Sequence, residues 1–207
     1  MEFWLVLYCD YLCMKNISVV IICKNESSCI AECLESVKLS DEVIVCDTWS
    51  TDNTVEIAKR FTDKIYHFEW CDDFSAARNY AKQFATNDWI LSIDCDEVLI
   101  TENWIQPLRD MIDTHGDSID AIKLDMWNWA NMHWNAIRLF KKELDWKWSI
   151  HEVIDSQNSI TSNACIRYWR SSSHDLDPDL DLRIMQKEHE KDPTNTRVMF
   201  YLAREYY

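Results

Sequence analysis

Four short runs of β-branched and apolar residues constrain the fold more than any other feature of this sequence. The runs read ISVVIIC (17–23), EVIVCD (42–47), KIYHFE (64–69) and WILSID (89–94), and polar residues lie at the end of each. Runs of this length and composition are typical of β-strands. Helical patterns separate them, so the sequence predicts βαβ units and a mostly parallel sheet.

The three intervening segments carry apolar residues at the spacing of an amphipathic helix. These residues are Ile30, Leu34 and Val37 in the first segment, Val55, Ala58 and Phe61 in the second, and Phe74, Ala77, Ala81 and Phe84 in the third. Asn53 and Glu56 are spaced like a capping box, which predicts that they cap the second helix.

The second half of the chain has a different pattern. Apolar and polar residues alternate in AIKLDMWNWA (121–130), and NAIRLF (135–140) follows after a short loop. This alternation predicts an antiparallel pair of strands. From about residue 180 onward, the sequence predicts two helices separated at Pro193.

The sequence therefore predicts three segments. Residues 1–16 form an N-terminal extension, 17–180 one α/β domain, and 181–207 C-terminal helices that could begin a truncated helical repeat. The extension has a short apolar stretch without a basic start or a small-residue cleavage site, so we expect neither a membrane-spanning helix nor a signal peptide. It could be a short apolar helix that docks on a membrane, giving peripheral membrane contact, or on the domain itself.

Composition excludes several classes of function. The 21 Lys and Arg residues face 36 Asp and Glu residues, and this formal charge of −15 argues against a nucleic-acid partner. The nine cysteines are an odd number without a CxxC pair, which favours a reducing, cytoplasmic location over a disulfide framework. The one glycine, Gly116, excludes the glycine-rich phosphate loops of Walker and Rossmann type.

Three acids, Asp94, Asp96 and Glu97, end the fourth predicted strand. Carboxylates at the end of a buried strand must be protonated, paired or bound to a cation, unless they form a solvated turn. The carboxyl ends of parallel strands form the binding edge of such a sheet. We therefore expect Asp94 and Asp96 to hold Mg²⁺ or Mn²⁺, cations that take one or two carboxylates together with phosphate oxygens.

Several consecutive segments resemble the family 2 glycosyltransferases of GT-A fold, in the branch often followed by tetratricopeptide helices. They read ISVVIICKNES, DEVIVCDTWSTDNTVEIAKRF, HFEWCDDFSAARNYA and NDWILSIDCDEVL. The resemblance implies an α/β fold whose mostly parallel nucleotide-binding sheet is flanked by helices and joined to a smaller antiparallel acceptor-side portion. Residues 17–99 would bind the nucleotide sugar, and residues 100–180 would form the acceptor half.

The same resemblance implies metal-dependent, inverting transfer of a sugar from a nucleotide diphosphate donor, usually uridine-linked. The residues that it assigns to the donor are Lys24, Asn25, Glu26, Asp47, Asp52, Arg78, Asn79 and Asp94. The metal, Mn²⁺ or Mg²⁺, would be held by Asp94, Asp96 and His174. Trp49 stands where the family usually has glycine, which predicts a reshaped or strained turn.

The acceptor half resembles the family from RLF (138–140) to the His-Glu pair at 151–152. Inverting transfer needs one base for the acceptor hydroxyl, and we expect Glu152 first and His151 second. The acceptor could be a glycan, a protein side chain or a lipid-linked saccharide. Tryptophans that could pack the antiparallel layer or stack on an acceptor sugar are Trp127, Trp129, Trp134, Trp146 and Trp148.

Two alternatives remain at this point. In a phosphohydrolase of the haloacid dehalogenase type, Asp94 would be the nucleophile and Asp96 the acid/base. That fold places its first motif at the start of the sheet, whereas three predicted strands precede Asp94 here. The other alternative is a catalytically inactive module that binds a partner through its C-terminal helices.

Overall fold

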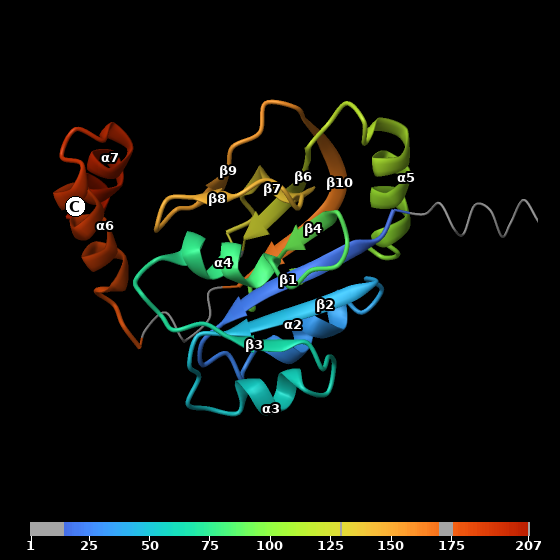
Figure 1. Ribbon diagram of the computed structural model, residues 1–207, viewed down its shortest axis with the longest axis horizontal. Helices are drawn as coiled ribbons and strands as arrows, with labels where there is room; N and C mark the ends of the chain where they lie inside the picture. Colours follow the sequence, from blue (N-terminus) through green and yellow to red (C-terminus); the bar gives the residue numbers. More distant parts are fainter. Residues whose placement is uncertain (1–14, 129, 170–175, 207) are drawn as a thin grey trace, which may run out of the picture.

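The computed structural model describes residues 15–128, 130–169 and 176–206. Its strands are β1 (Ile17–Cys23), β2 (Glu42–Asp47), β3 (Ile65–His67), β4 (Trp89–Ser92), β5 (Glu97–Leu99), β6 (Ala121–Asn128), β7 (His133–Lys141), β8 (Trp146–Lys147), β9 (Val153–Ile154) and β10 (Ser159–Tyr168). Its helices are α2 (Ile30–Ser36), α3 (Thr54–Ala58), α4 (Phe74–Lys82), α5 (Ile105–His115), α6 (Leu180–Lys191) and α7 (Thr196–Glu205). Figure 1 shows α6 and α7 beside the sheet domain, at the opposite end from α5.

One eight-stranded sheet organises the domain, in the order β3-β2-β1-β4-β7-β6-β10-β5. The first four strands in that order are parallel, as predicted. β7 then runs antiparallel to both β4 and β6, which confirms the predicted antiparallel pair. β8 and β9 form a separate antiparallel ribbon.

Helices cover both faces of the sheet. Apolar residues of α2 and α5 pack with β1 and β4 in the larger core, whereas α4 packs against β1 and β2 on the other face. Figure 1 shows α4 in front of the sheet and α2 behind it. Within the parts of the chain that the structure describes, none of the helices combines the length and the apolar character needed to cross a bilayer. The N-terminal extension lies outside the described residues except for its last two.

The predicted elements agree closely with the observed ones at the start of the chain. β1 and β2 have the predicted bounds, whereas β4 stops at Ser92, two residues early, because the chain turns there toward the acids. The predicted capping box is wrong: Asn53 precedes α3 but its side chain makes no capping hydrogen bond. Asp52 Oδ1 instead accepts from Thr54 N at 3.0 Å. The C-terminal helices separate around Pro193 as predicted.

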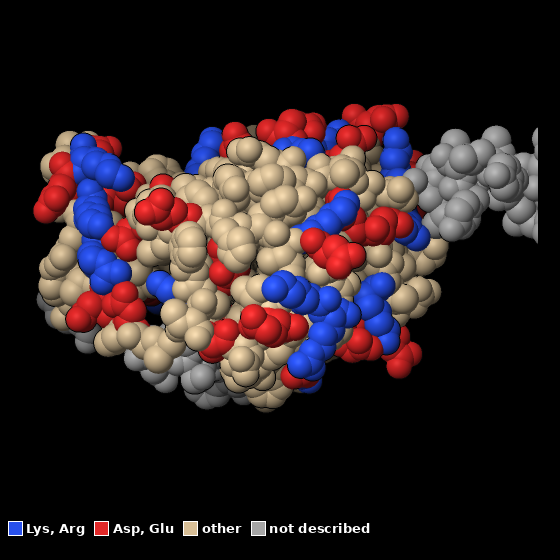
Figure 2. All heavy atoms as spheres, turned by 60° about the horizontal axis from the view of Figure 1, so that its bottom comes forward, with Lys and Arg blue, Asp and Glu red and all other residues tan. Residues whose placement is uncertain are grey.

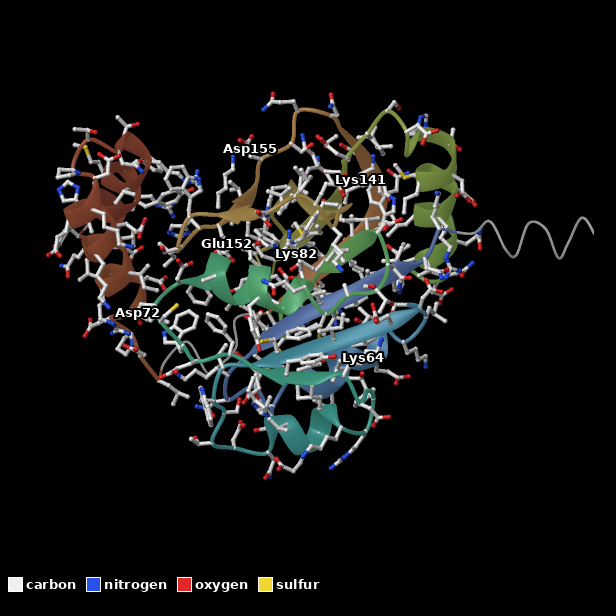
Figure 3. The ribbon with its side chains drawn as sticks, viewed as in Figure 1. Lys64, Asp72, Lys82, Lys141, Glu152 and Asp155 are labelled. Carbon is white, nitrogen blue, oxygen red and sulfur yellow. The ribbon has the colours of Figure 1, made fainter. Side chains whose placement is uncertain are left out.

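Buried Glu42 fastens the end of the sheet remote from the acids. Its side chain is only 3% exposed and accepts hydrogen bonds from Thr86 N at 2.8 Å, Thr86 Oγ1 at 3.0 Å, Ser18 Oγ and Lys64 Nζ. Burial alone would raise the pKa of Glu42, but the bonds from Lys64, Ser18 and Thr86 outweigh it and lower the pKa to about 2. The carboxylate thereby ties β1, β3 and the segment before β4 to the start of β2; Lys64 is labelled in Figure 3.

We predict that Glu42→Gln lowers the free energy of unfolding at pH 7 by about 2 kcal/mol, because it removes a charge that accepts several hydrogen bonds. A depressed folded-state pKa stabilises the fold above the unfolded-state pKa, and that contribution is lost as pH falls toward about 2. Urea unfolding at pH 7 and pH 3 should therefore show a smaller difference between wild type and variant at pH 3. Exposed Glu35→Gln is the control, with an expected change below about 0.5 kcal/mol. Equal losses in the two variants would contradict the assignment.

Candidate active site

The carboxyl ends of the parallel strands lie together at one edge of the sheet. Cys23 is paired with Asp47, and Asp47 with His67, so β1, β2 and β3 end side by side. β4 follows on the other side of β1, and its last residue, Ser92, lies beside Val20. The chain segment 93–96 therefore leaves the sheet at the same edge as the loops that begin at residues 24 and 48.

Arg78 lies at the centre of this edge. Its side chain is 7% exposed, and its Nη2 lies 2.6 Å from Asp94 Oδ1 while its Nε donates to Glu152 Oε1 at 2.6 Å. Nη1 donates to Ser92 Oγ at 3.5 Å, and the guanidinium carbon lies 5.1 Å from the Trp146 ring centroid. Burial alone would lower the pKa of Arg78, but Asp94 and Glu152 outweigh it and raise the pKa. Arg78 is therefore a buried, permanently charged group and not a surface ion pair.

Asp94 is shared by two guanidinium groups. Besides Arg78, Arg138 Nη1 approaches Asp94 Oδ2 at 3.5 Å, and Arg138 Nη2 also pairs with Glu97. Burial alone would raise the pKa of Asp94, but the two arginines lower it. Of the states considered for these acids, the structure shows Asp94 and Glu97 paired with arginines.

Glu97 supports the turn that carries Asp94. Its Oε2 accepts from Asp94 N at 2.9 Å, and its side chain is buried at the start of β5. Burial raises the pKa of Glu97 to about 7 although Arg138 opposes it. Glu97 therefore fixes the main chain at Asp94 by a hydrogen bond.

A β-bulge brings Arg138 to the site. Ile122 is paired with Leu139 and the next residue, Lys123, with Ile137, so Arg138 is the extra residue in β7. Bulges redirect side chains and are frequent beside active sites. Because Leu139 is also paired with Leu91 of β4, Arg138 lies next to the end of β4 and the acids that follow it.

Two loops of the predicted donor half are joined by side-chain bonds to the main chain. Asn25 Oδ1 accepts from Thr51 N at 2.7 Å, and Glu26 N donates to Thr54 Oγ1 at 2.7 Å. Asp52 Oδ2 accepts from Ser27 N at 3.1 Å. Burial alone would raise the pKa of Asp52, but its bonds with Thr54 and Ser27 lower the pKa to about 2. Lys24, in the same loop, is exposed.

Asp47 organises the tight turn that follows β2. Its carboxylate accepts from Trp49 N at 3.2 Å and from Ser50 N at 3.1 Å, and it lies 3.2 Å from His67 Nδ1. Trp49 has φ of 69° and a 62% exposed side chain. A left-handed conformation is costly for a bulky residue. The turn therefore keeps the backbone shape that glycine would take, with the strain predicted from the sequence.

The side chains of Asn79 and His151 contact other parts of the fold and not the Arg78 cluster. The Asn79 amide exchanges two hydrogen bonds with the main chain of Trp146, both at 2.9 Å, which joins α4 to β8. The His151 ring stacks on Tyr201 of α7 with centroids 3.9 Å apart, and burial lowers its pKa. Glu152, the next residue, points the other way toward Arg78; Figure 3 labels Glu152 above α4.

The tryptophans of the acceptor half differ in burial. Trp146 is buried against Phe140 and Arg78 and therefore packs the core. Trp134 and Trp148 have exposed indoles, and Trp127 stacks on His133. Trp129 lies outside the described residues.

The groups expected to hold a divalent cation are the carboxylates after β4. Asp96 is buried, and its carbonyl accepts from Trp169 N at 2.8 Å. His174 lies outside the described residues, and within the described ranges no group of three or more His, Cys, Asp and Glu side chains is arranged as a complete metal site. Mg²⁺ and Mn²⁺ bind through one or two carboxylates when a phosphate completes the shell, so the pair Asp94 and Asp96 fits such an ion.

Sequence reasoning missed Arg138 as a site residue. Its position in the strand segment RLF was noted, but alternation alone gives no sign of the bulge that turns its side chain toward Asp94. A basic residue in an otherwise apolar strand opposite the acid-bearing strand was the available signal.

The sheet, with a parallel half continued by an antiparallel portion, defines a GT-A type of fold. Crystal structures of S. aureus TarS share it: TarS residues 1–349 in complex with UDP-GlcNAc have a TM-score of 0.65, cover 82% of this chain and 64% of that chain, and are 16% identical. The chain belongs to glycosyl transferase family 2, whose profile matches residues 18–176.

Sequence relatives agree with this membership. A TPR repeat-containing protein of Synechococcus elongatus is 38% identical over 146 residues, which are 69% of this chain and 36% of that protein. Glycosyltransferase SunS, from Bacillus subtilis (SPbeta prophage), is 47% identical over 91 residues, 42% of this chain and 22% of that protein. The chain thus spans about a third or less of the length of these curated relatives.

We predict that Arg138→Met lowers the free energy of unfolding by about 3 kcal/mol, because it leaves buried Glu97 without its cation. Arg167→Met is the matched control: Arg167 pairs with exposed Glu32 at 3.2 Å, and its loss should cost under about 1 kcal/mol. Urea unfolding of both variants at pH 7 measures the difference. A loss for Arg138→Met no larger than for Arg167→Met would show that the pair with Glu97 does not stabilise the fold.

Proposed function

We propose that the protein is an inverting, metal-dependent glycosyltransferase that transfers a sugar from a UDP-sugar to an acceptor. The observation that carries the proposal is the cluster of buried Arg78 with half-buried Asp94, Arg138 and Glu152 at the carboxyl edge of the parallel strands. This edge is where open α/β sheets bind their ligands. The family membership and the UDP-GlcNAc complex of TarS, which has the same fold, support a uridine-linked donor.

The donor half of the site would bind the nucleotide. Lys24, Asn25 and Glu26 follow β1. Asp47 ends β2, and Asp52 belongs to the loop after it, which is bonded to Asn25, Glu26 and Ser27. The hydrogen bonds between the two loops hold them together at the edge of the sheet where Asp94 and Asp96 lie. We assign these loop residues to binding of the nucleoside. Asn79 would contribute by fixing the position of α4 through its bonds to Trp146.

Arg78 and Arg138 supply the fixed charge that a diphosphate requires. Guanidinium groups bind phosphate oxygens strongly because two N–H donors match two oxygens. In the structure both guanidinium groups are paired with carboxylates. A diphosphate would therefore bind together with a divalent cation. Asp94 and Asp96, with His174, would hold Mn²⁺ or Mg²⁺, which when bound stabilises the negative charge of the departing diphosphate.

Glu152 is the proposed base. As the acceptor oxygen forms its bond to the anomeric carbon, the bond to the diphosphate oxygen breaks on the opposite side, and Glu152 takes the hydroxyl proton. Attack from the opposite side inverts the configuration. Glu152 is preferred over His151 because its carboxylate lies in the Arg78 cluster, whereas the His151 ring is stacked on Tyr201. The buried Nε2 of His151 has no hydrogen-bond partner among the residues that the structure describes.

The acceptor remains open among a glycan, a protein side chain and a lipid-linked saccharide. The exposed indoles of Trp134 and Trp148 in the acceptor half are suited to stacking on a sugar ring. We propose a cytoplasmic enzyme with peripheral membrane contact through its N-terminal extension.

We predict that Asp96→Ala abolishes metal-dependent nucleotide binding. Wild-type protein should gain several degrees of thermal stability from UDP with Mn²⁺ and little from UDP with EDTA, because only the folded state binds the pair. Asp96→Ala should lose that gain. Asp88→Ala, which alters an exposed acid just before β4, should retain it. A full Mn²⁺-dependent gain in Asp96→Ala would refute the metal assignment, and no gain in wild type would favour an inactive interaction module.

We predict that Glu152→Gln lowers kcat by a factor of about 10² to 10⁴, the usual contribution of a general base. The amide keeps the size of the side chain and can still accept from Arg78, so stabilisation by UDP with Mn²⁺ should persist. UDP release from UDP-GlcNAc, UDP-glucose and UDP-galactose, with water as acceptor, measures turnover. Asp155→Asn on the neighbouring ribbon serves as control; Figure 3 labels Asp155 beyond Glu152. Normal turnover in Glu152→Gln would move the base elsewhere.

A further inference from the structure

The segment 148–151, directly before Glu152, has an unusual backbone. Trp148 has φ of 78° and His151 φ of 51°, both in the left-handed region. Bulky residues occupy this region only where surrounding contacts impose it, and such residues gather at functional sites. The contacts that impose it here come from the C-terminal helices.

Side chains of helix α7 contact both Trp148 and His151. Arg197 Nη2 donates to the carbonyl of His151, and its guanidinium carbon lies 5.9 Å from the Trp148 ring centroid and 5.1 Å from that of Tyr201. The His151 ring stacks on Tyr201 at an interplanar angle of 24°. One side chain thus contacts the first and last residues of the segment.

Helix α6 holds the middle of the segment. Ser149 Oγ donates to Glu188 Oε1 at 2.9 Å, and Met185 lies behind it in the core of the hairpin. The cavity left between the segment and the two helices is about 10 Å³, room for about one water molecule. Little free space therefore separates the segment from the two helices.

A second contact fixes the hairpin relative to α4. Asp72, just before α4, accepts from Arg183 Nε at 3.4 Å and from Lys187 Nζ, both on α6. Figure 3 labels Asp72 beside the lower end of α6, and Figure 2 shows basic and acidic side chains interspersed over this end of the molecule. The hairpin is thus attached on both sides of the Arg78–Glu152 pair, to the helix of Arg78 and to the segment of Glu152.

We propose that the α6–α7 hairpin positions Glu152 for proton transfer, with Arg197 and Tyr201 as its positioning residues. The inference rests on the proposed function, in which Glu152 is the base. Arg197 holds the carbonyl of His151, so it fixes the peptide unit that joins His151 to Glu152. The contacts of α6 and α7 described above go to Asp72 and to the segment 148–151, whereas the loops at residues 24–27 and 47–54 are bonded to each other. We therefore expect the hairpin to act on the rate of the chemical step and not on binding of the nucleotide.

A double-mutant cycle between Arg197→Ala and Glu152→Gln tests the proposal, with UDP release from the best of the three UDP-sugars as readout. Arg197→Ala should lower kcat at least tenfold while the KM for the donor changes less than twofold. The double variant should be no slower than Glu152→Gln alone, because residues that act as a unit are not additive. Arg197→Lys, which can still donate to the His151 carbonyl, should recover part of the rate. Gln186→Ala, which removes a bond to Tyr206 within the hairpin, should stay within twofold of wild type.

The outcomes separate the two proposals. A slow Glu152→Gln with a wild-type rate for Arg197→Ala, or with losses that multiply in the double variant, overturns the positioning role and leaves the base in place. Wild-type turnover for Glu152→Gln overturns both. If Arg197→Ala does not fold, Tyr201→Leu replaces it in the cycle, since it removes the ring beneath His151 and keeps the bond from Arg197.

Discussion

A buried guanidinium group, Arg78, is the constraint on which the candidate site depends. A charge in this position is costly to bury unless carboxylates surround it, so the chain must bring Asp94 and Glu152 to it from the end of β4 and the start of β9. Asp94 and Glu152 are 16 and 74 residues away from Arg78 in the sequence, and the arrangement of the sheet brings both into contact with it. Arg138 adds a second cation to the same carboxylate, and Glu97 balances it. The cluster therefore binds the parallel half of the sheet to the antiparallel half.

At this edge of the sheet two guanidinium groups lie among the three carboxylates of Asp94, Glu97 and Glu152. A ligand with both a diphosphate and a divalent cation adds little net charge to such a site, whereas a bare anion or a bare cation would disturb it. Positive charge is therefore concentrated locally in a protein whose formal charge is −15. Local arginines, fixed by buried carboxylates, supply what the overall composition lacks.

The parallel half of the fold was predictable from the sequence because its signals are local. β1 and β2 are continuous apolar runs, and the helices between strands show a clear amphipathic spacing. The acids at 94 and 96 were placed correctly at the sheet edge for the same reason. Arg138 was not, because it depends on a one-residue bulge that pairing between distant strands creates. Nor could the sequence show that Asn79 bonds to Trp146 or that His151 stacks on Tyr201, since both contacts join elements more than 45 residues apart.

Seven residues of the described chain have a positive φ, in the left-handed region of backbone conformation. None of the seven is glycine, and the single glycine, Gly116, has φ of −57° and is required for a different reason. A Cβ atom on Gly116 would lie 2.4 Å from the carbonyl oxygen of Ile112. Asn25, Trp49, Asp72, Trp148 and His151 thus hold conformations that glycine would adopt with less strain, and all lie in loops at the candidate site or before its helix. A glycine there would relieve strain but would also leave the unfolded chain freer and the loop less fixed. Large side chains at these positions accept local strain and gain contacts, such as Trp148 with Arg197, that hold each loop in one conformation.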